Sequence, residues 1–408
     1  MNKKRLIVIG GGAAGFFCAV NAARLNKNLE VIILEKSNKI LSKVRVSGGG
    51  RCNVTHACYS ITEMIKKYPR GGSFLKKAFH HFFTTDTIEW FKERGVLLKT
   101  EPDGRMFPVT NTSETIISCL VSEADKYAVQ IIMNSDVQEI KKEKHLFNIL
   151  LNNNKILQAD FICVACGGFP KSSQFNWLQQ TGHTIEEPVP SLFTFNIPQN
   201  AITGLMGITV EQVQVKIIST KLAEQGSLLI THWGLSGPAI LKLSAWGARY
   251  FHSVNYDYKI QINWLPAYNE QTLKDHLQKL RFDIASQKII NRNPFYLPQR
   301  LWEYFLTESE INMSIRWADL PAKEQNKLIK NLCAQVFEVK GKTTFKEEFV
   351  TAGGIELNEI DFNTMQSNIL PNLFFAGEVI NVDGVTGGFN FQNAWTTGWI
   401  AAKAIAAL

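Results

Sequence analysis

The sequence lacks an apolar run of the roughly 18–20 residues that a membrane-spanning helix needs. Its seven cysteines are few and irregularly spaced in 408 residues, which argues against a disulfide scaffold and predicts a cytoplasmic protein, where thiols stay reduced. The apolar stretch 6–9 follows a basic N-terminus but ends at glycines without a cleavage site, so a signal peptide is not expected. The sequence also shows no internal repeat and no low-complexity linker.

The composition is that of a globular protein. Hydrophobic residues make up 45% of the chain and charged residues 20%, which excludes disordered and fibrous classes. A chain of 408 residues is too long for one ordinary core, so two or three domains are expected. The 44 Lys and Arg residues exceed the 36 Asp and Glu residues and give a net charge of +8. This moderate positive charge is compatible with a polyanionic cofactor or partner.

The first 35 residues predict a βαβ unit, because two apolar strands flank a glycine turn and a buried helix. Asn111 and Glu114 predict a capping box at the start of a helix. After Pro190, alternating hydrophobicity predicts an antiparallel sheet or small barrel. The predicted strands are 5–9, 29–34, 129–133, 137–140, 146–151, 161–165, 209–217, 258–263 and 373–376. The predicted helical regions are 16–25, 61–128 (with a helix at 112–127), 268–332 and about 390 to the end.

The glycine turn Gly10–Gly15 matches G-x-G-x-x-G between a predicted strand and helix. Gly10 permits the tight turn, Gly12 leaves room for a pyrophosphate, and Gly15 allows the helix to pack closely on the strand. The helix N-terminus offers N–H groups to phosphates. Glu35 ends the next strand and is placed to accept hydrogen bonds from a ribose 2′-hydroxyl. The unit therefore predicts NAD or FAD rather than NADP.

Two further glycine-rich segments favour FAD. Three consecutive glycines lie in Ser47–Asn53, where they let the main chain approach a flat ligand. Near the C-terminus, the segment 377–392 places Gly387 and Gly388 just before a helix. Amides clustered there would stabilise the anionic reduced isoalloxazine at its N1–C2=O edge. We therefore expect the two segments to converge on one flavin.

These segments resemble one family, the bacterial NAD(P)/FAD-dependent oxidoreductase flavoproteins with BaiN-type and aminoacetone oxidase-like members. The resemblance spans the whole chain and is carried by VIGGGAAG, KVRVSGGGRCNVT, LLITHWGLSGPAIL, TAGG and FFAGEVINVDGVTGGFNFQNAW. It implies an α/β fold in which a Rossmann-like FAD-binding domain of glutathione-reductase type is interrupted by an inserted β-barrel and a helical domain. The expected domains are a discontinuous FAD-binding domain at 1–190 and 345–408, a β-barrel-like domain at 191–267 and a helical domain at 268–344.

The resemblance and the glycine motifs together predict the cofactor-binding residues, with Val137 contributing its backbone near the adenine. These residues are Gly10, Gly12, Ala13, Ala14, Gly15, Glu35, Lys36, Lys43, Ser47, Gly48, Gly49, Arg51, Cys52, Asn53, Val137, Gly167, Gly377, Glu378, Asp383, Gly387, Gly388, Phe389, Asn390, Phe391 and Gln392.

Several thiols and imidazoles are candidates for catalysis. Cys163 and Cys166 form C-x-x-C, but at the end of an apolar strand they are expected to be buried. Cys52 could be a reactive thiol, although a packing role is favoured because no relay partner is evident. His232 lies in a glycine-flanked loop and could donate a proton if the inserted domain covers the flavin; an ordered histidine at a domain contact is the alternative. No spacing typical of a metal site occurs, and none is expected.

The segment 64–81 contains five Lys and Arg residues and no acid, with Tyr68, Phe74 and Phe79 interleaved. It could contact the phosphates of ribosomal RNA and stack its bases. A solvated helix face over buried rings is slightly favoured. The oligomeric state is left open, and no membrane partner is expected.

The predicted reaction is hydride transfer through flavin N5. No second G-x-G-x-x-G with its strand, helix and acid occurs, so NAD(P)H would bind transiently or the substrate itself would reduce the flavin. The resemblance implies reduction of a conjugated C=C, first in a uridine of ribosomal RNA to give dihydrouridine, and second in an unsaturated steroid acid. The alternatives are an oxidase of a small amine or amino ketone that uses O2, and a non-enzymatic FAD-bound RNA-binding or redox-sensing protein.

Overall fold

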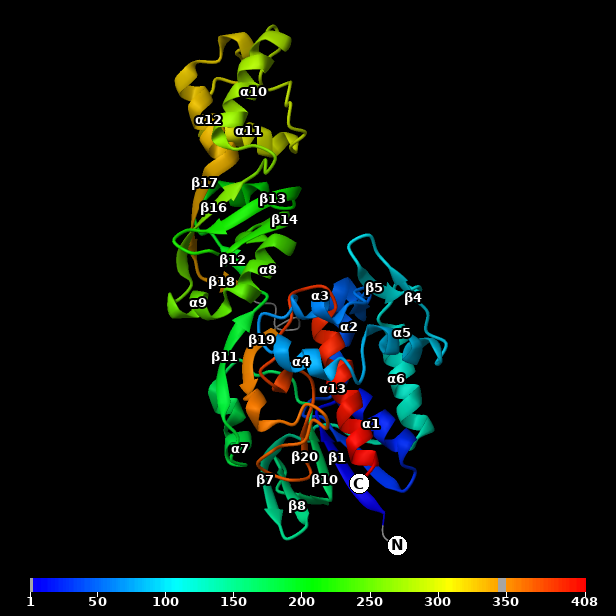
Figure 1. The fold of residues 1–408 in the computed structure, drawn as a ribbon. Coiled ribbons are helices and arrows are strands. Elements are labelled where there is room, and N and C mark those ends of the chain that lie inside the picture. Colours follow the sequence, from blue (N-terminus) through cyan, green and yellow to red (C-terminus); the bar gives the residue numbers. More distant parts are fainter. Residues whose placement is uncertain (1–2, 344–349) are drawn as a thin grey trace. The chain divides into compact units, whose positions relative to one another are not determined.

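The computed structural model describes residues 3–343 and 350–408. The chain divides into two compact units (Figure 1): the first comprises Met1–Ser191 and Phe345–Leu408, and the second comprises Leu192–Thr344. The predicted boundary at 344–345 lies outside the described residues. Among residues 3–343 and 350–408, none of the helices has the length and hydrophobicity of a membrane span.

The first unit is built on a five-stranded parallel sheet. Its strand order is β20-β10-β1-β2-β6, and every neighbouring pair is parallel. The apolar segments form these strands because both faces of the sheet are covered. The strands are β1 (Lys4–Ile9), β2 (Leu29–Leu34), β6 (Gln130–Ile132), β10 (Phe161–Val164) and β20 (Leu373–Phe375).

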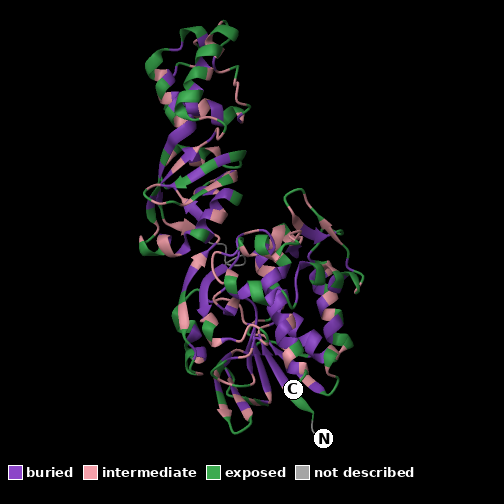
Figure 2. Cartoon of the chain, viewed as in Figure 1, coloured by how far each residue is buried: buried purple, intermediate pink, exposed green. Residues whose placement is uncertain are grey.

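Two helices from opposite ends of the chain pack side by side in this unit. They are α1 (Ala13–Leu25) and α13 (Phe389–Ala406). Gly398 permits the close approach, because a Cβ there would lie 2.8 Å from the Ala14 carbonyl oxygen. Figure 2 shows both helices and the strands beside them as largely buried. The N-terminus of α1 is thereby fixed beside the C-terminal glycine segment.

Small antiparallel sheets and short helices complete the first unit. Three strands pair in the order β7-β8-β9, three in the order β3-β5-β4, and β11 pairs with β19. The strands are β3 (Thr55–His56), β4 (Leu98–Thr100), β5 (Arg105–Pro108), β7 (Val137–Glu143), β8 (Leu146–Leu151), β9 (Ile156–Ala159), β11 (Ile185–Ser191) and β19 (Val350–Ile355). The helices are α2 (Ser42–Gly50), α3 (Ile61–Ile65), α4 (Gly72–Ala78), α5 (Thr84–Lys92), α6 (Glu114–Lys126) and α7 (Asn176–Gln179).

The second unit contains a seven-stranded antiparallel sheet in the order β17-β16-β13-β14-β15-β12-β18. Only Gly341 separates β17 from β18 along the chain, although these strands stand at opposite ends of that order. The sheet must therefore curl until its edges meet, as the barrel-like prediction requires. The strands are β12 (Thr194–Asn196), β13 (Thr209–Ile217), β14 (Ala223–Thr231), β15 (Gly234–Ser236), β16 (Asp257–Asn263), β17 (Gln335–Lys340) and β18 (Lys342–Thr343).

The helices of the second unit share one apolar core with this sheet. Ile260 of the sheet, Leu277 of α10 and Leu328 of α12 belong to the same buried cluster. Two domains were expected at 191–267 and 268–344, whereas Leu192–Thr344 forms one compact unit, in which β17 follows the helices and pairs with β16. The helices are α8 (Pro238–Trp246), α9 (Ala248–Ser253), α10 (Glu270–Asp283), α11 (Gln299–Glu308) and α12 (Ala322–Ala334).

One local prediction was wrong and one was incomplete. The capping box at Asn111 and Glu114 does not form, because Glu114 pairs with Arg45 at 2.6 Å and the Ser113 hydroxyl donates to the Arg45 carbonyl. Asn111 instead has φ 54° and ends a turn that begins at Pro108. The mainly helical segment 61–128 also contains the antiparallel pair β4–β5, whose short strands carry too little periodicity to be recognised in the sequence.

Candidate functional site

The glycine turn before α1 is shaped by two close contacts and one open side. A Cβ on Gly10, which has φ 115°, would lie 2.4 Å from the Ala165 carbonyl oxygen. A Cβ on Gly15 would lie 2.0 Å from the Gly10 carbonyl oxygen. A Cβ on Gly12 would have no neighbour within 4 Å. Packing therefore requires two of these glycines, whereas Gly12 keeps the space in front of the α1 N-terminus free.

Glu35 is held beside this turn by its own hydrogen bonds. Its Oε2 accepts the Gly11 N–H at 2.8 Å, and its Oε1 accepts the N–H and the hydroxyl of Ser37 at 2.9 and 2.8 Å. The Glu35 carbonyl accepts the Ser135 N–H at 2.9 Å, which brings the start of β7, with the buried Val137, to the same end of the sheet. The carboxylate thus lies within reach of the place where the ribose of a dinucleotide would be, if the pyrophosphate binds at the N-terminus of α1.

The triple glycine forms a break in α2. Gly48, Gly49 and Gly50 all have positive φ, between 59° and 82°. A Cβ on Gly48 would lie 2.7 Å from the Phe107 ring, whereas a Cβ on Gly49 or Gly50 would have no neighbour within 4 Å. Arg51 is fixed by Glu101 at 2.6 Å and lies 4.0 Å over the Phe107 ring. The bare main chain, rather than the Arg51 side chain, therefore faces the open side.

The structure brings this loop to the C-terminal glycine segment, as the sequence predicts. With its amide oriented to satisfy both polar atoms, Asn53 accepts the Gly388 N–H at 3.0 Å and donates to the Thr55 carbonyl at 3.0 Å. The Thr55 hydroxyl donates to Gln392 Oε1 at 2.6 Å, and His56 Nδ1 lies 3.1 Å from the Gly387 carbonyl oxygen. Segments more than 330 residues apart thereby form one glycine-lined site.

The polar side chains of the C-terminal segment bind other parts of the protein. Gln392 is fully buried and also accepts from Thr87. Asn390 pairs with both the N–H and the carbonyl of Gly384. Asp383 is fully buried and binds Arg70 and Ser191. These side chains position the loop, and the main chain of the α13 N-terminus remains to meet a ligand.

Glu378 links two further parts of the site. Its Oε2 accepts from Lys43 Nζ at 2.6 Å, and its Oε1 accepts the Thr351 N–H at 2.7 Å. Gly377, with φ 78°, donates its N–H to the Thr397 hydroxyl and lies against Ala14 of α1. Sequence spacing does not indicate the pairs Lys43–Glu378 and Arg70–Asp383, because their partners lie 335 and 313 residues apart.

The residues present fit FAD. Gly12, Gly49 and Gly167 expose main chain on which a Cβ would meet nothing within 4 Å, so a flat or phosphorylated ligand can approach closely. The N-termini of α1 and α13 would offer N–H groups and positive dipole ends to phosphates and to a reduced flavin ring. Lys36 is exposed and lies 4.9 Å over the Phe169 ring, beside the segment that contains Gly167.

The cysteine candidates belong to the first unit and the histidine candidate to the second. Cys163 is buried as expected, whereas Cys166 is partly exposed; burial nevertheless raises the pKa of the Cys166 thiol to about 12, which favours a packing role for the C-x-x-C pair. His232 is exposed in the turn between β14 and β15, with its ring 4.0 Å from that of Trp233. It belongs to the second unit and remains a predicted proton donor. Residues 3–343 and 350–408 contain no His, Cys, Asp and Glu cluster suited to a metal ion.

Cys52 is expected to be chemically inert in the folded protein. It is fully buried, and burial raises the pKa of its thiol to about 12. At pH 8 only about one thiol in 10⁴ would be ionised. We expect iodoacetamide to label the partly exposed Cys58 first, as peptide mass mapping would show, and Cys52→Ser to retain bound FAD. Equal labelling rates at both cysteines in native protein would contradict this expectation.

The basic segment 64–81 is a solvated helix face over buried rings. Tyr68, Phe74 and Phe79 are at most 9% exposed, whereas Lys66, Lys67, Lys76 and Lys77 are exposed. The rings of this segment are therefore too buried to stack on bases, which agrees with the interpretation of a solvated helix face over buried rings.

Comparisons with known proteins show the family of the chain. The family profile described as "HI0933-like protein Rossmann domain" matches residues 4–404. The chain is 29% identical to the ribosomal RNA dihydrouridine synthase of Escherichia coli, over 99% of this chain and 98% of that protein. It is 26% identical to the 3-dehydro-bile acid delta(4,6)-reductase of Clostridium scindens, over 98% and 99%. A 3-ketosteroid delta1-dehydrogenase from Sterolibacterium denitrificans has a similar fold, with TM-score 0.53, 12% identity and full coverage of both chains.

Proposed function

The chain belongs to the HI0933-like family of FAD-dependent oxidoreductases, and we propose that it reduces the C5=C6 bond of a uridine in ribosomal RNA to give dihydrouridine. The observation that carries the proposal is the end-to-end similarity to a ribosomal RNA dihydrouridine synthase. Reduction of an unsaturated steroid acid is the second candidate, supported by the similarly complete match to a bile acid reductase. The net charge of +8 favours the RNA substrate.

FAD, when bound, supplies hydride transfer at N5. In the proposed reaction, NAD(P)H provides the hydride, a proton completes the saturated bond, and NAD(P)⁺ and dihydrouridine are the products. The residues of this chain act by binding and orientation. The α13 N-terminus is held by the Asn53 contact with Gly388 and by the Thr55 hydrogen bond to Gln392, and its remaining N–H groups would stabilise the negative charge of a reduced ring. Glu35 and Gly12 shape the part of the site that faces the dinucleotide.

The proposal is tested by mass analysis of ribosomal RNA from the source organism and from a strain that lacks this gene. One dihydrouridine is expected to disappear from the deletion strain, leaving a uridine lighter by two hydrogens, and to return on complementation. An unchanged dihydrouridine content would reject the RNA substrate.

Anaerobic mixing of the purified protein with NADH or NADPH distinguishes a reductase from an oxidase. Rapid loss of the flavin absorption supports a reductase. Slow loss, together with peroxide formation from a small amine in air, would instead establish an oxidase.

A further inference from the structure

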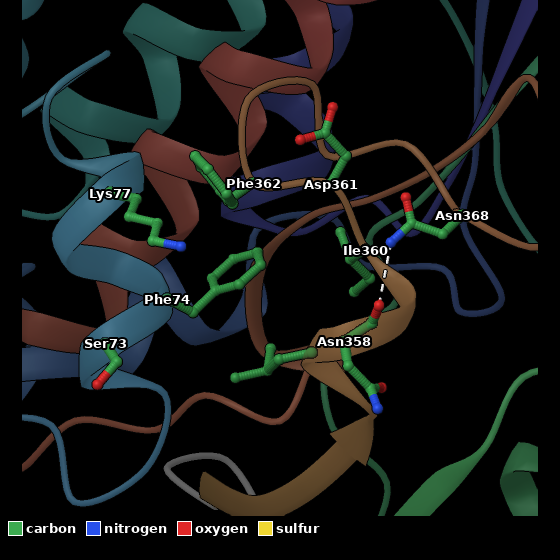
Figure 3. Close-up of a pocket in the computed structure, with 9 residues that line it drawn as sticks. Ser73, Phe74, Lys77, Asn358, Ile360, Asp361, Phe362 and Asn368 are labelled. Carbon is green, nitrogen blue, oxygen red and sulfur yellow. Dashed lines mark hydrogen bonds between the residues drawn. The ribbon is translucent and has the colours of Figure 1, made fainter.

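A surface pocket lies between α4 and the loop that joins β19 to β20, within the first unit. It has a volume of about 550 Å³, and its lining includes Phe74 and Lys77 of α4 and Asn358, Asp361, Phe362 and Asn368 of the loop (Figure 3). None of these residues is among the predicted FAD contacts. The volume falls in the range of roughly 300–1,000 Å³ that is typical of small-ligand sites, and it accommodates a group the size of one nucleotide.

The pocket combines a cation with aromatic rings. Lys77 Nζ lies 4.4 Å from the centroid of the Phe362 ring, and Phe74 faces the same space (Figure 3). Lys77 is exposed and Phe362 is partly exposed, so a ligand can reach both. An ammonium group beside an accessible ring matches the phosphate and the base of a nucleotide.

The one acid of the pocket is already engaged within its own loop. Asp361 Oδ1 accepts from the main chain and the side chain of Asn363, each at 3.0 Å, and Oδ2 accepts from Thr364 at 2.8 Å. Figure 3 shows this carboxylate turned away from the Lys77 ammonium group. A phosphate at Lys77 therefore does not face an unsatisfied carboxylate.

Two amides complete the lining. Asn368 Nδ2 donates to the Asn358 carbonyl at 3.0 Å, which holds the two residues together. Both are exposed, and the Asn358 side chain can offer a donor and an acceptor to a base edge.

We propose that this pocket binds one nucleotide of the RNA substrate outside the flavin site, with its base against Phe362 and its phosphate at Lys77. The inference rests on the proposed function. The exposed Lys66 and Lys67, in the loop between α3 and α4, add positive charge ahead of α4. The stacking ring comes from a loop almost 300 residues away, and not from the buried rings of the basic segment.

The test measures binding of a fluorescein-labelled oligouridylate to the FAD-loaded protein by fluorescence anisotropy over a series of salt concentrations. Phe362→Ala is expected to weaken binding about tenfold through lost stacking. Phe362→Leu, which keeps an apolar side chain and guards against misfolding, is expected to show a similar loss. Lys77→Ala is expected to lower the slope of log affinity against log salt by about 0.7. The matched control is Lys76→Ala, which changes an exposed lysine of the same helix outside the pocket lining.

Each outcome has a distinct meaning. Losses at Phe362 and Lys77 that exceed the loss at Lys76, with unchanged FAD content, support the pocket. If the Phe362 and Lys77 variants bind no more weakly than Lys76→Ala, the proposed pocket is wrong, and the proposed function is unaffected. Failure of the wild-type protein to bind oligouridylate or deproteinised ribosomal RNA overturns both.

Discussion

Replacing Gly12 by Ala is expected to give a folded protein that has lost most of its affinity for FAD. Gly12 has φ −92° and ψ −171°, which Ala adopts without strain. The added Cβ would meet no protein atom within 4 Å and would stand where the pyrophosphate must approach α1. A steric conflict of about 1–3 kcal/mol corresponds to a loss of about 5- to 150-fold in FAD affinity. Flavin fluorescence titration of the apoprotein measures it.

Gly15→Ala is expected to act on the fold instead. Its Cβ would lie 2.0 Å from the Gly10 carbonyl oxygen, a main-chain atom that cannot move aside. Helix propensity favours Ala over Gly by only about 1 kcal/mol, whereas forced overpacking costs about 1–3 kcal/mol or more. We therefore expect a lower free energy of unfolding in urea even without FAD.

Gly204→Ala provides the matched control for both variants. Gly204 lies in the second unit, and a Cβ there would also meet nothing within 4 Å. Its FAD affinity and stability should equal those of the wild type. If Gly12→Ala retained wild-type FAD affinity, the assignment of the α1 N-terminus as the pyrophosphate site would be wrong.

The sequence predicts best those parts of the fold in which the signal is local. Strand, glycine turn, helix and acid follow one another within 35 residues, and β1, α1 and β2 form as predicted. The segment 209–217 alternates hydrophobic and polar residues and becomes β13 with the same bounds. The hydrophobic period and the turn residues are sufficient to predict these elements, because each element is determined by its own residues.

The parts that escaped prediction depend on distant partners. β17 closes the inserted sheet by pairing with β16, about 75 residues earlier, and nothing in its own short alternation identifies that neighbour. The convergence of Asn53 with Gly388 was anticipated only because both segments carry glycines without an evident structural use. The ion pairs that lock the site join residues that spacing rules cannot connect, since those rules compare positions within one helix or strand.

Removing Arg70 is expected to destabilise the first unit strongly. Asp383 is fully buried, and Arg70 binds both of its carboxylate oxygens, with the Ser191 hydroxyl donating to Oδ2 at 2.8 Å. Arg70→Ala would leave a buried carboxylate without its counter-ion. Such a loss typically costs about 3–5 kcal/mol of unfolding free energy. The loop before α13 would be released with it, so FAD content should also fall.

The pH dependence of this loss identifies the buried charge as its cause. Burial raises the pKa of Asp383 above that of an ordinary aspartate, while Arg70 acts in the opposite direction. Without Arg70 the folded-state pKa rises further, and the folded state then binds a proton more readily than the unfolded state does. Stability of Arg70→Ala should therefore decrease as pH rises through the Asp383 pKa and recover in acid. Urea unfolding at a series of pH values measures this.

Two controls separate charge from packing. Lys67→Ala changes an exposed lysine in the same loop and should alter stability by less than about 0.5 kcal/mol. The double variant Arg70→Met with Asp383→Leu removes both charges and should be much more stable than Arg70→Ala, because apolar replacements of a buried pair are often nearly neutral. If Arg70→Ala lost less than about 1 kcal/mol at every pH, the ion pair would not hold the C-terminal glycine loop in place. The geometry of the flavin site would then depend on the α1–α13 packing and on the hydrogen bonds of Asn53 and Thr55 to the C-terminal segment.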